Sequence, residues 1–165
     1  MFQIKPISKQ SIPTALERAE RYRLLNEPML AESICLDILD ADPENSQAIV
    51  TMLLAITDQF GRSSLADINQ AKQLLPRLPD EYEREYYAGL ICERQGKSKL
   101  DKHMPDGGFV AYEWLRDAMG HYEKAEAIRP PGKDDAILRW NTCARLIIRH
   151  HLKPVDEKYI EPPLE

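Results

Sequence analysis

The chain has 165 residues, of which 43% are hydrophobic and 30% are charged, and its formal net charge is −5 at neutral pH. This length supports one domain with a buried core, and the hydrophobic content is too high for an intrinsically disordered protein. The negative charge argues against non-specific nucleic-acid binding, and no apolar run approaches the roughly 20 residues that span a bilayer, so we expect neither nucleic acid nor membrane as a partner.

Cysteine usage and the N-terminal residues indicate the compartment. The sequence begins without the long apolar core and small-residue cleavage site of a secretory signal. Its three cysteines, Cys35, Cys92 and Cys143, are an odd number and show no CxxC spacing. Buried free thiols in a reducing compartment explain these cysteines best. We therefore expect a cytoplasmic protein.

Helical periodicity dominates the first half of the chain, where apolar residues recur at three- and four-residue steps. Residues 1–11 form an extension before the first predicted helix. Turn formers such as Pro28, Pro43, Gly61 and Pro79 separate the apolar stretches. The third helix is apolar on most sides, as expected for a helix that is covered on both flanks. The predicted helices cover residues 13–25, 28–39, 46–60 and 65–75.

The second half contains three further helical stretches and one break in this rhythm. Residues 97–109 are polar and rich in turn formers, and they predict an inserted loop. This insertion is either a tolerated solvated loop or a functional one, in which Leu100, Met104 and Phe109 cover the helices or touch a partner. Residues 153–165 are a polar, proline-bearing tail. The predicted helices cover residues 81–95, 110–128 and 134–151.

Small residues, an aromatic residue and a proline recur at fixed positions in the helix pairs. The third pair closes with Ala118-x3-Tyr122-x2-Ala125-x4-Pro130, and Gly89 supplies a small residue in its first helix. This pattern resembles the tetratricopeptide repeat, whose helix pairs of roughly 34 residues carry small residues where the two helices touch and a proline at the end. An alanine or glycine at such a position lets two backbones approach closely.

The spacing of the prolines agrees with this resemblance. Pro79 follows Pro43 by 36 residues, close to one repeat. Pro130 follows Pro79 by 51 residues, which corresponds to one repeat plus the insertion in the third pair. The match has one consistent departure from the family pattern. The first aromatic residue of the signature is absent from all three pairs, at Ala15, Ile49 and Glu85.

The resemblance implies an all-α fold in which antiparallel helix pairs stack as a short right-handed superhelix. This repeat domain would span residues 12–152, and the last helix would cap the final apolar face. The three expected pairs cover residues 12–45, 46–80 and 81–131, followed by the capping helix at 134–151.

In tetratricopeptide folds the first helix of each pair lines a concave groove that receives a peptide or helix. The residues expected to face this groove form a floor that is apolar in the centre and charged at the edges. Such a floor suits an amphipathic helix or an extended segment with apolar anchors. These residues are Leu16, Glu20, Arg23, Val50, Leu54, Thr57, Glu83, Tyr86, Leu90 and Glu93, with Leu138, Asn141 and Arg145 from the last helix.

Some members of the family hold the C-terminal carboxylate of a chaperone with Lys and Asn side chains. The matching positions here provide no cation, and two of them are carboxylates that would repel such a ligand. We therefore expect no binding of a free acidic C-terminus. The matching positions are Leu16, Glu20, Thr51, Glu83 and Tyr87.

No residue pattern indicates catalysis, a cofactor or a metal. The four histidines include no pair at the helical i, i+4 spacing of a zinc motif. The sequence contains neither a glycine-rich phosphate-binding pattern nor a serine in a nucleophile elbow. We therefore expect no enzyme, no cofactor and no catalytic or metal-binding residue.

These features predict a protein–protein interaction module, acting as an adaptor, a scaffold or an assembly factor. Two alternatives remain open at this stage. In the first alternative, the chain is a structural repeat protein that associates with copies of itself. In the second, it is an accessory subunit of an enzyme encoded elsewhere.

Overall fold

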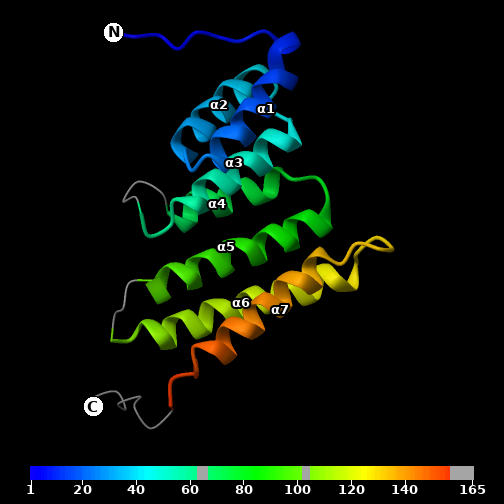
Figure 1. Cartoon of the computed structure of the whole chain (residues 1–165). Coiled ribbons are helices and arrows are strands. Elements are labelled where there is room, and N and C mark those ends of the chain that lie inside the picture. Colours follow the sequence, from blue (N-terminus) through cyan, green and yellow to red (C-terminus); the bar gives the residue numbers. More distant parts are fainter. Residues whose placement is uncertain (63–66, 102–104, 157–165) are drawn as a thin grey trace, which may run out of the picture.

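The computed structural model describes residues 1–62, 67–101 and 105–156, and over these residues it contains seven α-helices and no strand. The prediction of an all-α fold is therefore confirmed for the described part of the chain. Short 3-10 turns at Lys9–Ser11 and Leu75–Arg77 accompany these helices. The helices are α1 (Ile12–Leu24), α2 (Pro28–Ala41), α3 (Ser46–Asp58), α4 (Ile68–Leu74), α5 (Glu81–Asp101), α6 (Gly107–Ala127) and α7 (Asp135–Arg149), labelled in Figure 1.

Local capping explains where several helices begin. Pro28 occupies the first turn of α2, where its missing N–H would have no helical acceptor. The Asn45 side chain accepts a hydrogen bond of 2.9 Å from the Ala48 N–H at the start of α3. At α4 the Asp67 side chain accepts from the Gln70 N–H, and the Gln70 side chain accepts from the Asp67 N–H. This reciprocal capping box fixes the start of α4 although the helix has only seven residues.

The predicted loop over residues 97–109 is wrong for most of its length. Residues 97–101 belong to α5 and residues 107–109 belong to α6, while Met104 lies outside the described residues. The polarity of 97–101 suggested a loop, but Lys, Ser and Leu are compatible with a helix, and tertiary contacts decide the outcome. Ser98 is buried, and its hydroxyl donates a hydrogen bond of 2.7 Å to the carbonyl oxygen of Gln95.

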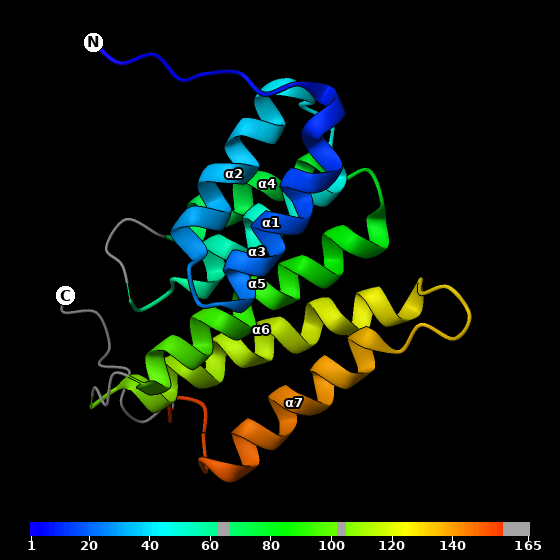
Figure 2. The same cartoon turned by 45° about the horizontal axis from the view of Figure 1, so that its top comes forward.

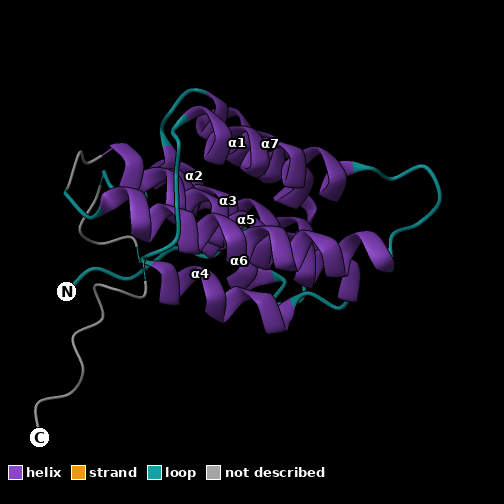
Figure 3. Ribbon diagram, turned by 90° about the horizontal axis from the view of Figure 1, so that it is seen from below, coloured by secondary structure: helices purple, strands orange, loops and turns teal. Residues whose placement is uncertain are grey.

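The helices pack in chain order. Each helix from α1 to α6 contacts the helix that follows it in the chain. Smaller contacts join α1 to α3, α3 to α5 and α5 to α7. Figures 1 and 2 show the result as a stack that starts with α1 and α2 and ends with α7. Seen from below in Figure 3, the helices lie across the view in similar orientations.

Two buried clusters hold this stack together, and α5 contributes to both. The first cluster includes Ile49 and Leu53 of α3 together with Leu90 of α5. The second includes Leu115 and Tyr122 of α6, which are fully buried under α5 and α7. The helix α7 contributes its fully buried Ala136 and Cys143 to this cluster.

Small residues occupy the closest helix contacts. A Cβ atom added to Gly89 of α5 would lie 2.6 Å from Cε1 of Tyr122 on α6, so no side chain fits there without a shift of that ring. Ala19 and Ala118 are fully buried, as expected for positions where neighbouring helices touch. Within the described residues, none of the helices combines the length and the apolar character needed to cross a bilayer.

Candidate functional site

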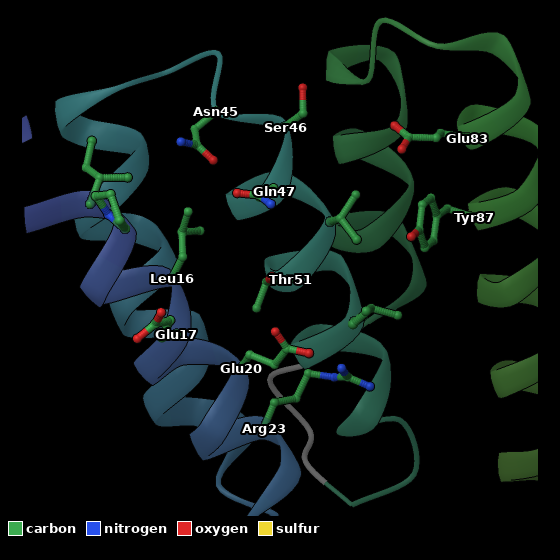
Figure 4. A pocket seen from close by; sticks show the side chains of 14 residues that line it. Leu16, Glu17, Glu20, Arg23, Asn45, Ser46, Gln47, Thr51, Glu83 and Tyr87 are labelled. Atoms are coloured by element: carbon green, nitrogen blue, oxygen red, sulfur yellow. The ribbon is translucent and has the colours of Figure 1, made fainter.

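A cavity of about 730 Å³ opens between α1, α3 and α5. We call it the α1–α3–α5 groove. Figure 4 shows Leu16, Thr51 and Tyr87 from these three helices facing the same space. The groove is lined by Ile12, Pro13, Leu16, Glu17, Glu20, Arg23, Asn45, Ser46, Gln47, Val50, Thr51, Leu54, Glu83 and Tyr87.

Helical geometry explains why these side chains share one space. Positions three or four residues apart lie on one face of a helix, and the lining residues of α1 follow this spacing. Neighbouring helices contribute equivalent positions. Leu16, Thr51 and Tyr87 are 35 and 36 residues apart in the sequence, and all three line the groove.

Six residues that the sequence predicted for the groove line this cavity. The helix α1 contributes three of them. The six are Leu16, Glu20, Arg23, Val50, Leu54 and Glu83.

Three other predicted groove residues are turned away from the cavity. Thr57 is 2% exposed and its hydroxyl donates a hydrogen bond of 2.9 Å to the carbonyl oxygen of Leu54. Leu90 is 1% exposed and belongs to the first buried cluster. The ring of Tyr86 packs against the ring of Tyr122 in the second buried cluster. Successive residues of an α-helix are rotated by about 100° around its axis. If the groove-facing positions are predicted one residue out of place, a predicted groove residue can therefore lie in the core.

The last helix does not contribute to the groove. Asn141 is half-buried and Arg145 is exposed, and neither lines the cavity. Leu138 is 62% exposed on the same helix. That these three residues take part in partner binding stays a prediction, although none of them lines this cavity.

One carboxylate connects the three helices of the groove. Asp58, at the end of α3, accepts a hydrogen bond of 2.7 Å from Nε of Arg23 on α1. It also accepts from Nη1 of Arg94 on α5. The side chains of all three residues are about one-fifth exposed, which limits screening by solvent. The charge of Arg23 is therefore already compensated at the edge of the groove.

Three carboxylates of the groove have no such pairing within the described residues. Glu17 and Glu20 on α1 and Glu83 on α5 form no ion pair with any residue that the structure describes. Between them lie partly exposed apolar side chains, including Leu54 of α3. Burial raises the pKa of Tyr87 to about 12, so its hydroxyl stays protonated at neutral pH. The groove thus offers apolar surface beside negative charge.

A second polar cluster surrounds a carboxylate that is closed to solvent. Glu93 of α5 is fully buried, and it accepts hydrogen bonds from the Tyr122 hydroxyl at 2.6 Å and from Nζ of Lys97 at 2.6 Å. Nη1 of Arg139 on α7 donates to it at 3.3 Å, and Nε of Arg139 donates to the Tyr86 hydroxyl at 3.4 Å. Burial and the adjacent charge of Glu93 raise the pKa of Tyr122.

This buried cluster joins α5, α6 and α7 rather than forming a binding site. Glu93 was predicted to face the groove, but it lies on the side of α5 that faces α6 and α7. A buried carboxylate is tolerated because three donors compensate its charge. Sequence reasoning missed the cluster because its members, Glu93, Tyr122 and Arg139, are 29 and 17 residues apart along the chain.

A second cavity of about 550 Å³ lies between α4, α5 and α6. We call it the α4–α6 cleft, and no sequence pattern pointed to it. It is lined by Lys72, Leu75, Ala88, Cys92, Trp114, Arg116, Asp117, Gly120, His121 and Lys124.

The buried thiols offer little reactivity. Burial raises the pKa of Cys92 to about 11 and the pKa of Cys35 and Cys143 to about 12, so all three are protonated and unreactive at neutral pH. Nδ1 of His121 lies 2.8 Å from a carboxylate oxygen of Glu85. Across the described part of the chain, no three His, Cys, Asp or Glu side chains are grouped as metal ligands.

Comparison with protein-family models, with curated proteins and with solved structures gave no match to this chain.

Proposed function

We propose that this chain is a tetratricopeptide-like helical repeat that acts as a protein–protein interaction module, an adaptor, scaffold or assembly factor. The α1–α3–α5 groove receives a helix or an extended peptide of a protein partner. The module needs no cofactor and carries out no reaction of its own, and it works in the cytoplasm. The protonated, unpaired thiols are consistent with such a reducing compartment.

The repeat character is supported by contacts between equivalent positions. Arg23, Asp58 and Arg94 are joined by two ion pairs and are separated by 35 and 36 residues. These separations are close to one tetratricopeptide repeat. The contacts of α1 with α3, of α3 with α5 and of α5 with α7 fit a stack in which the first helices of successive pairs lie next to each other.

The single observation that carries the proposed function is the composition of the groove. Leu16, Val50 and Leu54 remain partly exposed in a cavity whose volume is in the range of known binding sites. Exposed apolar side chains that are grouped in a concave surface mark interaction sites more often than scattered ones do. A peptide with apolar anchors would cover them.

The test is capture of partners from an extract of the source cells, followed by mass spectrometry. Leu54→Glu places a charge in the groove, and Leu36→Glu is the matched control because Leu36 is 52% exposed and does not line the groove. The partner should be lost with Leu54→Glu and kept with Leu36→Glu. Hydrogen exchange of the purified complex should then show protection of α1 and α3. A partner that is retained by Leu54→Glu would overturn the proposal.

Self-association is the second candidate, and an exposed apolar face on α7 favours it. Leu138 is 62% exposed and Ile148 is 71% exposed on this terminal helix. Light scattering over a range of protein concentrations distinguishes the two functions. A dimer that dissociates with Leu138→Glu would support self-association. A monomer at all concentrations would instead favour partner binding in the α1–α3–α5 groove. If the captured partner is an enzyme, the chain is its accessory subunit.

A further inference from the structure

The α4–α6 cleft lies on the far side of α5 from the groove. Cys92 lines the cleft and Glu83 lines the groove, and both belong to α5. They are nine residues apart, which corresponds to roughly half a turn around the helix axis at about 100° per residue. The cleft is therefore a separate surface, which a ligand in the groove would leave free.

A shortened helix leaves room for the cleft. The helix α4 has seven residues, against 21 in α6, with which it shares the cleft. On α5, the residues that line the cleft have small side chains, namely Ala88 and Cys92. On α6, a Cβ atom added to Gly120 would meet no atom within 4 Å, so this glycine leaves open space.

The cleft has apolar walls and a basic rim. Leu75 and Trp114 provide the larger apolar surfaces. Lys72 on α4 and Arg116 and Lys124 on α6 supply three positive charges at the rim. Nζ of Lys72 lies 5.7 Å from the centroid of the Trp114 ring, so the cation and the aromatic face meet across the cleft.

The positive charges exceed the negative ones in the cleft. Asp117 is the carboxylate among its lining residues, and Glu85 lies against His121. Within the described part of the chain, Lys72 and Lys124 form no ion pair. A basic rim on a chain with a net charge of −5 is a local feature, and it complements an acidic ligand.

We propose that the α4–α6 cleft binds an acidic amphipathic helix of a protein partner. The apolar face of that helix packs on Trp114 and Leu75, and its carboxylates pair with the rim cations. The positions of the cations suit a helix, because Arg116 and Lys124 are eight residues apart on α6, or roughly 12 Å along its axis. Carboxylates spaced two turns apart on the partner helix match this distance.

The experiment uses two designed 14-residue amphipathic helices with the same leucine face. One carries glutamate on its remaining positions and the other carries lysine. Binding is followed by the fluorescence of Trp114 in the Trp140→Phe variant, since the chain has only two tryptophans. The acidic peptide should change the emission saturably, the basic peptide should not, and added salt should weaken the binding.

Variants separate this site from the groove. Reversal of both lysines, Lys72→Glu with Lys124→Glu, should weaken the binding of the acidic peptide at least tenfold without changing the melting temperature, because both side chains are exposed. Gly120→Leu fills the cleft and should also weaken binding, while Leu54→Glu in the groove should have no effect. Equal binding of the two peptides, the absence of a saturable change, or full affinity after charge reversal would overturn the proposal.

Discussion

Gly89 and Gly120 both lie inside long helices, but their surroundings differ. A Cβ atom at Gly89 would come within 2.6 Å of the Tyr122 ring, whereas one at Gly120 would meet nothing within 4 Å. We expect Gly89→Ala to lower the free energy of unfolding by about 1–3 kcal/mol through overpacking. Gly120→Ala should leave it unchanged or raise it by up to about 1 kcal/mol, because alanine favours the helix. Urea denaturation of both variants tests this difference, and equal midpoints would contradict it.

Glu93 and Glu83 offer a second comparison on one helix. Glu93 is fully buried with three donors around it, whereas Glu83 has no ion pair with a described residue. Glu93→Ala leaves the buried Tyr122 hydroxyl without its acceptor. Lys97 and Arg139, in contrast, remain hydrated because their side chains are 38% and 34% exposed. The substitution should therefore cost about 1–3 kcal/mol of stability. Glu83→Ala should cost less than about 0.5 kcal/mol. Thermal and urea unfolding of both variants provide the measurement. Similar losses would show that the Glu93 cluster has no stabilising role.

The buried thiols predict a loss of stability at alkaline pH. Burial raises the pKa of Cys92 to about 11 and of Cys35 and Cys143 to about 12, above the ordinary value of 9.0. The unfolded chain therefore ionises first, and the stabilisation present below pH 9 is lost as the pH rises toward the folded values. Each thiol contributes a slope of up to about 1.4 kcal/mol per pH unit, which is reached only well above the unfolded pKa.

Urea midpoints under reducing conditions, between about pH 9 and pH 10, test this slope, to which the buried tyrosines with raised pKa add toward the upper end of the interval. Cys35→Ala removes one thiol, so its stability should fall less steeply with pH than that of the parent chain. A stability that is independent of pH over this interval would be incompatible with three buried thiols.

At the scale of the element, the extended ends of α5 and α6 change what a deletion should do. Ser98 and Gly107 are buried within these ends, so residues 98–101 and 105–108 are more than a solvated link. We expect replacement of 98–108 by a four-residue turn to lower the free energy of unfolding by at least about 2 kcal/mol. Urea denaturation is the measurement. An unchanged midpoint would restore the interpretation of this segment as a tolerated loop.

The positions of the helices could be predicted from the sequence, but their rotation could not. Prolines and apolar periodicity placed the start of α2 at Pro28 and of α3 at residue 46, as observed. The helix α3 is apolar on most sides, so its pattern does not define which side faces the groove. As a result, Thr57 was predicted to face the groove, while the structure turns Asp58 toward α1 and α5.

The groove on α1 could be predicted because that helix is amphipathic. The α4–α6 cleft and the Glu93 cluster could not be predicted, since both depend on which distant residues meet. Lys72 and Trp114 face each other across 42 residues of sequence. Nothing in the local pattern around either residue indicates this contact.

At the scale of the whole molecule, α7 closes the second buried cluster. Its buried residues Ala136 and Cys143 cover α6, and Arg139 reaches Glu93. Removal of residues 134–165 should therefore expose the cluster and lower the melting temperature by more than about 10 °C. Arg145→Ala, at an exposed position of α7, is the control and should leave it unchanged. Circular dichroism follows the melting, and a truncated chain as stable as the full one would refute this capping role.

Two consecutive residues of α5 fix its orientation from both sides. Arg94 forms an ion pair with Asp58 of α3. The preceding residue, Glu93, accepts hydrogen bonds from Tyr122 of α6 and Arg139 of α7. Rotation of α5 about its own axis would strain both sets of bonds at once. The stack should therefore be torsionally stiff at its centre, so that any change in its curvature would arise from helices tilting apart rather than from α5 turning in place.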